Sequence, residues 1–227
     1  MTRSARRSSK VCLKVWGRNA CFTRPEMKVE RVSYDVMTPS AARGILEAIL
    51  WKPAIRWTVE QIDVLEPIRW ESVRRNEVGC VMSHRADGIF VEEERQQRAG
   101  LFLRDVAYTV HACFELTDKA GGEDNVIKFQ EMFERRVSKG QVFHRPYFGC
   151  REFAADFSPV PSDALPEPIA ESRDLGYMLL DIIHDHNGGK NFNPHHCGAK
   201  CLPQFFRANL DAGRLRVPPV DGMEVRS

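Results

Sequence analysis

The sequence predicts an α+β fold built from two strand–helix–strand units, followed by a smaller β-rich segment. Apolar and polar residues alternate along residues 11–16, 54–65 and 106–116, which is the period of a half-buried strand. Residues 38–53 and 128–139 instead carry helix signals, and each of these stretches follows a strand. This order of elements is the split βαβ, or ferredoxin-like, pattern.

The first unit follows residues 1–9, a basic and serine-rich stretch that we expect to be a disordered tail. Its helix begins at Thr38, because a hydroxyl N-cap followed by Pro39 in the first turn is typical of a helix start. Pro53 predicts the end of the helix, since the residue before a proline disfavours helical dihedrals. The strand at residues 54–65 completes this unit.

A polar segment separates the two units. Residues 74–98 begin with Arg74 and Arg75 and end with Arg98, and they contain Asp87-Gly88, a dipeptide typical of hairpin turns. We therefore expect a β-hairpin arm that is inserted in the domain and projects from it.

The second unit and the C-terminal part follow the arm. Apolar side chains recur at helical spacing in residues 128–139, and Gly140 predicts the end of that helix. A hairpin over residues 141–157 completes a first domain of residues 10–158. Beyond a proline-rich linker we expect a small, mostly β C-terminal domain at residues 169–227, with a strand at 176–183, a flexible insertion at 184–200 and a short helix at 204–212.

Charge is distributed unevenly along the chain, although the formal net charge is only +2. Residues 1–79 hold 15 Lys and Arg against 9 Asp and Glu, a net charge of +6, which leaves −4 for residues 80–227. The chain has 24 Arg and 9 Lys. Arginine is the better residue for bidentate phosphate contacts and for stacking on bases. A genome rich in G and C would favour the same ratio.

Two further observations bear on the location of the protein. The sequence contains no apolar run of the ~20 residues that a membrane span needs. Seven cysteines, an odd number, are scattered over the whole chain, which is not the pattern of a disulfide framework. We therefore expect a cytoplasmic protein without membrane partners.

The block from Cys21 to Pro53 combines cations and aromatic residues around one helix. Arg24, Lys28 and Arg31 precede the helix beside Tyr34, and Lys52 follows it. Such an arrangement suits a phosphate-bearing polymer whose bases can stack.

Several segments, in order, resemble those of a known family: FTRPEMKVERVSYDVMTPSAARGILEAI, WKPAIRW, RRNEV, RQQRA and GCREF. Between about Val11 and Asp181, the chain resembles the Cas-five subunit of CRISPR subtype I-C, the "d" (or "c") variant of the repeat-associated RNA-binding superfamily. Residues His184 to Lys200 depart from the family pattern.

The resemblance implies an RNA-recognition-like ferredoxin fold with a projecting arm and a small C-terminal β-domain. It implies a Cascade subunit that holds the repeat-derived 5′ handle of CRISPR RNA beside the backbone and large subunits, with target DNA reached through the complex. It also implies an endoribonuclease that cuts the precursor repeat RNA without metal or other cofactor. In that reaction the ribose 2′-OH attacks the adjacent phosphate and leaves a cyclic phosphate.

Such chemistry needs a base, a cation on the developing phosphorane charge and a proton donor for the leaving oxygen. Some family members supply these groups with a Tyr before the WKP motif and a Lys-His pair that opens the second helix. Here Leu50 and Phe129 occupy two of those positions, and Lys128 retains the third. The catalytic candidates are therefore Lys128, His144 and Tyr34. The alternative is a non-catalytic, handle-binding scaffold.

The candidate RNA-binding residues are cations of the first block and of the arm: Arg24, Lys28, Arg31, Arg43, Lys52, Arg74 and Arg75. Each reading has an alternative in which these cations pair with nearby carboxylates of the chain. Glu26 and Glu30 are the partners in the first block, and Glu92 to Glu94 are those in the arm.

A cluster of His and Cys near the C-terminus has two readings. It comprises His184, His186, His195, His196, Cys197 and Cys201. Two ligand pairs separated by a short loop are the kind of set that Zn²⁺ binds. The Gly- and Asn-rich filling equally fits a flexible insertion with incidental clustering, which is the reading we favour. We expect no metal site.

Overall fold

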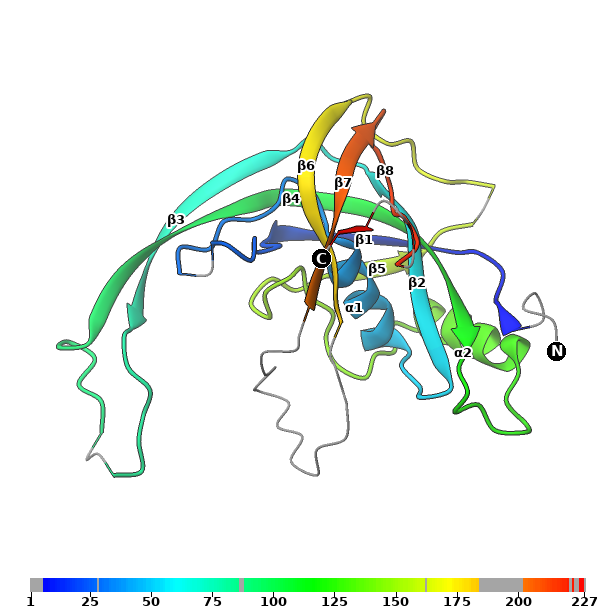
Figure 1. The fold of residues 1–227 in the computed structure, drawn as a ribbon, viewed down its shortest axis with the longest axis horizontal. Helices are drawn as coiled ribbons and strands as arrows, with labels where there is room; N and C mark the ends of the chain where they lie inside the picture. The colour runs from blue at the N-terminus through cyan, green and yellow to red at the C-terminus, as the bar shows by residue number, and fades with distance from the viewer. Residues whose placement is uncertain are drawn as a thin grey trace.

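In the part of the chain that the structure describes, the strands form one nine-stranded sheet, and two helices pack against it (Figure 1). The computed structural model describes residues 6–27, 29–85, 88–161, 163–183, 202–220, 222 and 225–226. The elements are β1 (Val11–Ala20), α1 (Pro39–Ile49), β2 (Ile55–Val64), β3 (Arg69–Val78), β4 (Arg95–Leu116), α2 (Val126–Ser138), β5 (Asp156–Pro159), β6 (Arg173–Ile183), β7 (Leu202–Asp211), β8 (Arg214–Arg216) and β9 (Val225–Arg226).

The strand order is β5-β1-β4-β2-β8-β7-β6, with β3 paired to β4 and β9 paired to β7. All of these neighbours run antiparallel. The C-terminal strands therefore continue the main sheet, because β8 pairs with β2 at Ile62 and its neighbours. The fold is a mostly antiparallel sheet with few helices.

Both predicted helices are confirmed, and so is the start signal of the first, Thr38 followed by Pro39. The Thr38 side chain accepts a hydrogen bond from Ala41 N, and α1 begins at Pro39. At the second helix, Asn125 caps the first turn by accepting from Lys128 N, at 2.9 Å. Gly140 follows the helix with φ +63°, a conformation that glycine adopts without steric cost. Among the described residues, no helix is long and apolar enough to cross a membrane.

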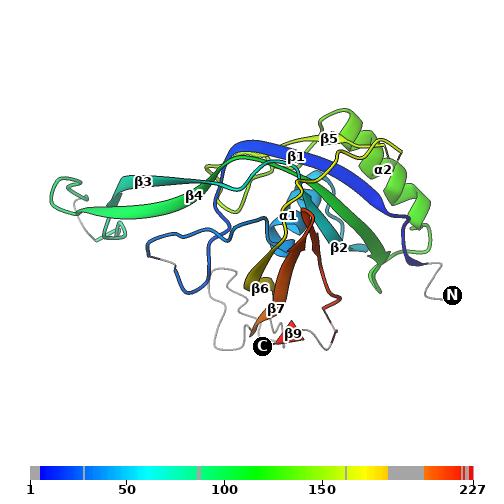
Figure 2. The same cartoon turned by 90° about the horizontal axis from the view of Figure 1, so that it is seen from above.

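The arm is a two-stranded ribbon of β3 and the N-terminal half of β4, paired from Arg69 with Arg104 to Val78 with Arg95. It extends from one side of the body, away from α2 (Figure 2). The sequence predicted that the arm starts at residue 74, but the strand pairing starts earlier, at Arg69. Of the expected Asp87-Gly88 turn, Asp87 lies outside the described residues.

The prediction of a short helix at residues 204–212 is wrong, because this segment is part of strand β7. Phe206, Ala208 and Leu210 are buried, and the residues between them are exposed, so the side chains alternate with the period of a strand. The strand expected at residues 176–183 is confirmed within β6. The expected insertion at 184–200 lies outside the described residues.

The end of the expected disordered tail runs beside β4. Ser8 N donates to the Phe114 carbonyl oxygen at 2.9 Å, and Phe114 N donates to the Ser8 hydroxyl at the same distance. Arg7 forms an ion pair with Glu60. Residues 6–9 are therefore held against the sheet.

A buried polar chain crosses three neighbouring strands. His111 on β4 contacts Asp63 of β2 through Nε2 at 2.7 Å and Cys12 of β1 through Nδ1 at 3.2 Å. Burial alone would lower the pKa of His111, but the hydrogen bonds to Asp63 and Cys12 outweigh it and raise the pKa to about 9. His111 is therefore an imidazolium at neutral pH, paired with the Asp63 carboxylate inside the protein.

Candidate functional site

Arg24 and Arg31 of the first block are in contact with carboxylates. The Arg24 guanidinium lies 4.6 Å from the centre of the Tyr34 ring and 3.1 Å from the Asp35 carboxylate. Arg31 lies 3.3 Å from Glu152 and 3.7 Å from Glu77. Glu152 and Glu77, the partners of Arg31, come from other parts of the chain. The sequence had suggested Glu26 and Glu30 instead. Lys28 lies outside the described residues.

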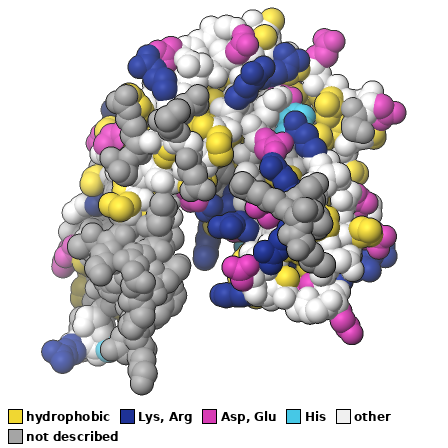
Figure 3. Space-filling model, turned by 45° about the vertical axis from the view of Figure 1, so that its right-hand side comes forward, with side chains coloured by type: hydrophobic (Ala, Val, Ile, Leu, Met, Phe, Trp, Pro, Cys, Tyr) yellow, Lys and Arg dark blue, Asp and Glu magenta, His cyan; other side chains and the backbone are white. Residues whose placement is uncertain are grey.

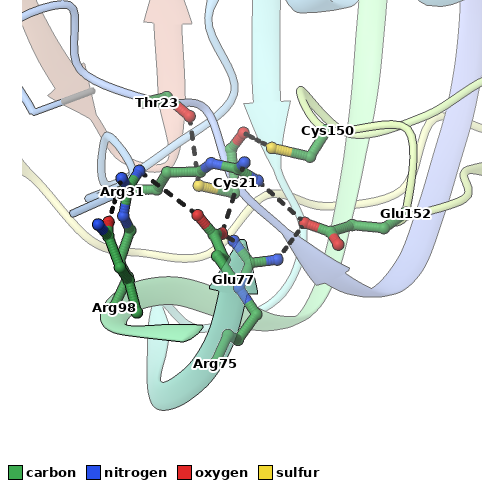
Figure 4. Close-up of polar contacts among 9 residues, drawn as sticks. Cys21, Thr23, Arg31, Arg75, Glu77, Arg98, Cys150 and Glu152 are labelled. Atoms are coloured by element: carbon green, nitrogen blue, oxygen red, sulfur yellow. Dashed lines mark hydrogen bonds and ion pairs between the residues drawn. The ribbon is translucent and has the colours of Figure 1, made fainter. Parts of the chain in front are cut away.

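Arg31 belongs to a network at the base of the arm, shown in Figure 4. Arg75 reaches Glu152 at 2.6 Å and Glu77 at 3.4 Å, and Arg98 reaches Glu77 at 3.5 Å. Three guanidinium groups thus face two carboxylates, which leaves one net positive charge on partly exposed side chains. Arg74 points to the other face of the arm and is exposed, as the alternation along β3 requires.

Arg43 of α1 forms a bidentate pair with Asp181 of β6, and its Nε also lies 3.7 Å from Glu47. Burial would lower the pKa of Arg43, but the contact with Asp181 outweighs it, so the guanidinium stays charged. The pair joins the first helix to the C-terminal strands. The role of Arg43 in RNA binding stays a prediction.

Lys52 and Lys128 approach the same carboxylate. Lys128 Nζ lies 2.9 Å from Asp124 Oδ1, and this contact, together with the more distant Lys52, lowers the pKa of the Asp124 carboxyl. Lys128 of α2 and Lys52, in the loop after α1, therefore both act on one partly buried carboxylate just before α2. Trp51, next to Lys52, is 59% exposed.

The two apolar residues at family catalytic positions are part of the core. Leu50 is fully buried, and its carbonyl oxygen accepts a hydrogen bond from Trp57 Nε1 at 2.9 Å. Phe129 is 3% exposed and packs against Phe114. Neither side chain offers a polar atom for chemistry.

His144 and Tyr34 lie away from Lys128. The loop that carries His144 folds back along α1, where Phe143 N donates to the Ala48 carbonyl oxygen at 2.8 Å. His144 is exposed there, with its ring 6.2 Å from that of Tyr147. Tyr34 is buried, its hydroxyl accepts a hydrogen bond from Leu179 N, and burial raises its pKa. Of the three catalytic candidates, the structure brings none into contact with another.

A cavity of about 300 Å³ opens beside the N-terminal half of α1. Its walls are Thr38, Ser40, Ala41 and Gly44 of the helix region, Phe22 and Thr23 after β1, Tyr147 and Gly149 of the loop after α2, and Leu179 of β6. On the face shown in Figure 3, Lys and Arg side chains gather around a hollow in the surface. The sequence did not indicate this cavity, because its walls come from four distant segments.

The described residues contain no cluster of three or more His, Cys, Asp or Glu that could hold a metal ion. The His and Cys between positions 184 and 201 lie outside that part of the chain. The zinc reading of this cluster is therefore untested.

Comparison with known proteins identifies the family. Residues 11–218 match the family described as CRISPR-associated protein (Cas_Cas5). The chain is 48% identical over 236 residues to "CRISPR pre-crRNA endoribonuclease Cas5d" of Mannheimia succiniciproducens, with 96% of this chain and 99% of the relative covered. It is also 48% identical over 212 residues to the protein of the same name from Thermus thermophilus, with 91% of this chain and 90% of the relative covered.

A solved structure titled "Crystal Structure of CRISPR-associated Protein" has the same fold. It matches with a TM-score of 0.70 at 19% sequence identity, over 98% of this chain and 99% of that one. The family match and the two relatives confirm the sequence resemblance noted between Val11 and Asp181. This protein belongs to the Cas5d family of CRISPR-associated proteins.

Proposed function

We propose that this protein is a precursor CRISPR RNA endoribonuclease that also binds the repeat-derived 5′ handle as a subunit of Cascade. The observation that carries the proposal is the 48% identity to the Mannheimia relative, a protein named as a pre-crRNA endoribonuclease, over nearly the whole of both chains. The partners that we propose are CRISPR RNA, the backbone and large subunits of the complex, and target DNA reached through the complex. We place the protein in the cytoplasm.

We further infer that β1, α1, β2, β4, α2 and β5 form the ferredoxin-like unit. The strand order β5-β1-β4-β2, with a helix between the first and second and between the third and fourth strands in the chain, supports this reading. The arm formed by β3 and β4 is then an insertion between its halves. The strands from β6 onward would be the C-terminal domain.

The proposed reaction needs no metal: the 2′-OH attacks the adjacent phosphate, and the 5′-oxygen leaves. We infer that Lys52 and Lys128 would stabilise the negative charge that develops on the phosphate, an inference supported by their shared electrostatic effect on Asp124. Asp124 would hold Lys128 in position before RNA binds. His144 supplies an exposed imidazole, the commonest proton-transfer group in enzymes, whereas Tyr34 would have to leave the core to act.

We propose that RNA binds near the base of the arm and near α1. The candidate residues are Arg24, Arg31, Arg43, Lys52, Arg75 and, on the other face of the arm, Arg74, together with Lys28, which lies outside the described residues. Arg31 and Arg75 support it best, because their network with two carboxylates retains a net positive charge. Phosphates of the RNA would compete with Glu77 and Glu152 for these guanidinium groups.

The test is cleavage of the cognate repeat RNA by purified protein in EDTA, followed on a denaturing gel. We expect a product that ends in a cyclic phosphate. Lys128→Ala and Lys52→Ala should slow cleavage by about ten-fold or more, as loss of one charge-stabilising group does. Lys139→Ala, which removes an exposed lysine beyond the other end of α2, is the matched control and should cleave normally. Absence of cleavage by the unaltered protein would contradict the nuclease proposal.

A second candidate function is a handle-binding scaffold whose RNA is cut by another protein. The burial of Leu50 and Phe129 at family catalytic positions favours it. Tight, salt-sensitive binding of repeat RNA without any product would support the scaffold over the nuclease.

A further inference from the structure

Two cysteines that are 129 residues apart in the sequence meet at the end of β1. Cys21 N donates to the Phe148 carbonyl oxygen at 3.1 Å, and the Cys150 thiol donates to the Cys21 carbonyl oxygen at 3.7 Å (Figure 4). Thr23 Oγ1 lies 3.5 Å from Cys21 Sγ.

The close approach of the two segments is fixed by Gly149. Its φ is +77°, and a Cβ atom at this position would lie 2.0 Å from the Cys21 carbonyl oxygen. Only glycine therefore allows the loop to pass so near the end of β1. The position of the Cys150 thiol beside the Cys21 backbone follows from this geometry, and not from the flexible ends of long side chains.

The two thiols differ in exposure and in charge. Cys21 is fully buried, whereas Cys150 is partly exposed. The neighbouring Cys21 thiol lowers the pKa of Cys150; burial and Glu152 oppose the shift, and Arg31 and Thr23 add to it. The same contact and burial raise the pKa of Cys21. A partly exposed thiolate beside a second, protonated thiol is the arrangement of a redox-reactive cysteine pair.

The other described cysteines lack such an arrangement. Cys12 contacts His111, and Cys113 is buried beside Arg7 and Glu60. Cys80 is exposed on the arm, where partial loss of solvent and the nearby Glu94 raise its pKa. Among the described cysteines, it is thus Cys21 and Cys150 that lie beside each other, with the Cys150 thiol on the Cys21 carbonyl oxygen.

We propose that Cys150 and Cys21 form a thiol–disulfide exchange site whose substrate is a low-molecular-weight disulfide such as oxidised glutathione. The Cys150 thiolate attacks one sulfur of the disulfide, forms a mixed disulfide and releases one glutathione thiolate. Cys21 then attacks the Cys150 sulfur and displaces the second glutathione, which takes up the proton that Cys21 loses. Two protein thiols are oxidised to one disulfide, and oxidised glutathione is reduced to two molecules of glutathione.

The disulfide would tie the end of β1 to the loop that carries Glu152 and two walls of the cavity, Tyr147 and Gly149. It would therefore hold Glu152 close to Arg31 and Arg75. The site itself does not depend on RNA cleavage, so its test is independent of the proposed nuclease activity.

The test treats the reduced, full-length protein with oxidised glutathione, blocks free thiols with N-ethylmaleimide and digests it with trypsin. Cys21 and Cys150 lie in separate tryptic peptides, residues 19–28 and 140–151, and each peptide contains a single cysteine. We expect these two peptides to be linked. Cys21→Ser should stop at a glutathione mixed disulfide on Cys150, and Cys150→Ser should show no linkage. Cys12→Ser is the control and should retain the linkage.

Absence of the linked peptide in the unaltered protein, under conditions in which Cys80 takes up glutathione, would overturn the proposal. A second test, the rate of alkylation of each thiol, uses the unaltered chain and so does not depend on the folding of any variant. At pH 6, iodoacetamide should alkylate Cys150 about ten-fold faster than Cys80, because the thiolate is the reacting species. Equal rates for the two residues would also contradict it.

Discussion

Replacing Asp63 with asparagine is expected to lower the free energy of unfolding by up to about 3 kcal/mol at pH 6.5 and by much less above pH 9. The magnitude follows from His111, whose pKa rises from 6.5 to about 9 in the folded protein. Each pKa unit corresponds to 1.36 kcal/mol of differential interaction, so the contacts of His111 with Asp63 and Cys12 together contribute about 3 kcal/mol, which is the upper limit of the loss in Asp63→Asn. Both side chains are almost completely buried, so solvent screens the pair little.

The pH dependence has a definite sign. Between pH 6.5 and 9, folded His111 keeps its proton, whereas the unfolded chain has lost it. Raising the pH therefore favours unfolding of the wild-type protein, and the contribution of His111, complete below pH 6.5, is lost by about pH 9. The pKa of Asp63 is lowered, so its own contribution is lost only in acid, outside this window.

Urea unfolding at pH 6.5 and pH 9, followed by tryptophan fluorescence, measures the effect, since Trp57 is buried in the core. The wild-type free energy should fall between the two pH values, and that of Asp63→Asn should not. Asp174→Asn removes an exposed carboxylate that pairs with Arg207, and it should behave like the wild type. An equal loss for Asp63→Asn at both pH values would show that His111 is neutral in the folded protein, and the reasoning would fail.

Three further predictions follow from local geometry and charge. Gly149→Ala should destabilise the protein by more than about 1 kcal/mol in thermal melts, because its Cβ would meet the Cys21 carbonyl oxygen. The control Gly44→Ala should keep the wild-type stability, because its Cβ would meet nothing within 4 Å. Equal melting points for the two variants would refute the clash at Gly149. Thr38→Ala removes the N-cap of α1 and should cost about 1 kcal/mol in urea unfolding, with no change in stability counting against the cap. Arg75→Gln should reduce the salt slope of repeat-RNA binding by about 0.7, the value for one contact to a single strand. An unchanged slope would exclude Arg75 from the RNA surface.

Local signals predicted most of the secondary structure. The hydroxyl of Thr38 and the ring of Pro39 act within one turn, so adjacent residues are enough to predict the start of α1. The error at residues 204–212 had a local cause too. Phe206, Ala208 and Leu210 alternate at period two, but the short segment also contains good helix formers, and pairing with β6 decides for the strand.

The partners of the charged side chains in the site could not be predicted from the sequence. Arg31 has Glu30 beside it in the chain, yet it pairs with Glu77 of the arm and with Glu152, 121 residues away. Partner choice among charged side chains depends on which strands and loops the sheet brings together, and periodicity carries no such information. The contact between Cys21 and Cys150 depends in the same way on a loop that crosses the end of β1.

The length of β4 has a mechanical consequence for the arm. This strand of 22 residues pairs with β3 along its first half and with β1 and β2 along its second half. Tension along the arm would therefore load the hydrogen bonds of the central strand in shear, where many bonds must break together and not one after another. The inner half of β4 is thus held by strands on both of its edges, so a force applied to the arm would be transmitted to the core of the protein.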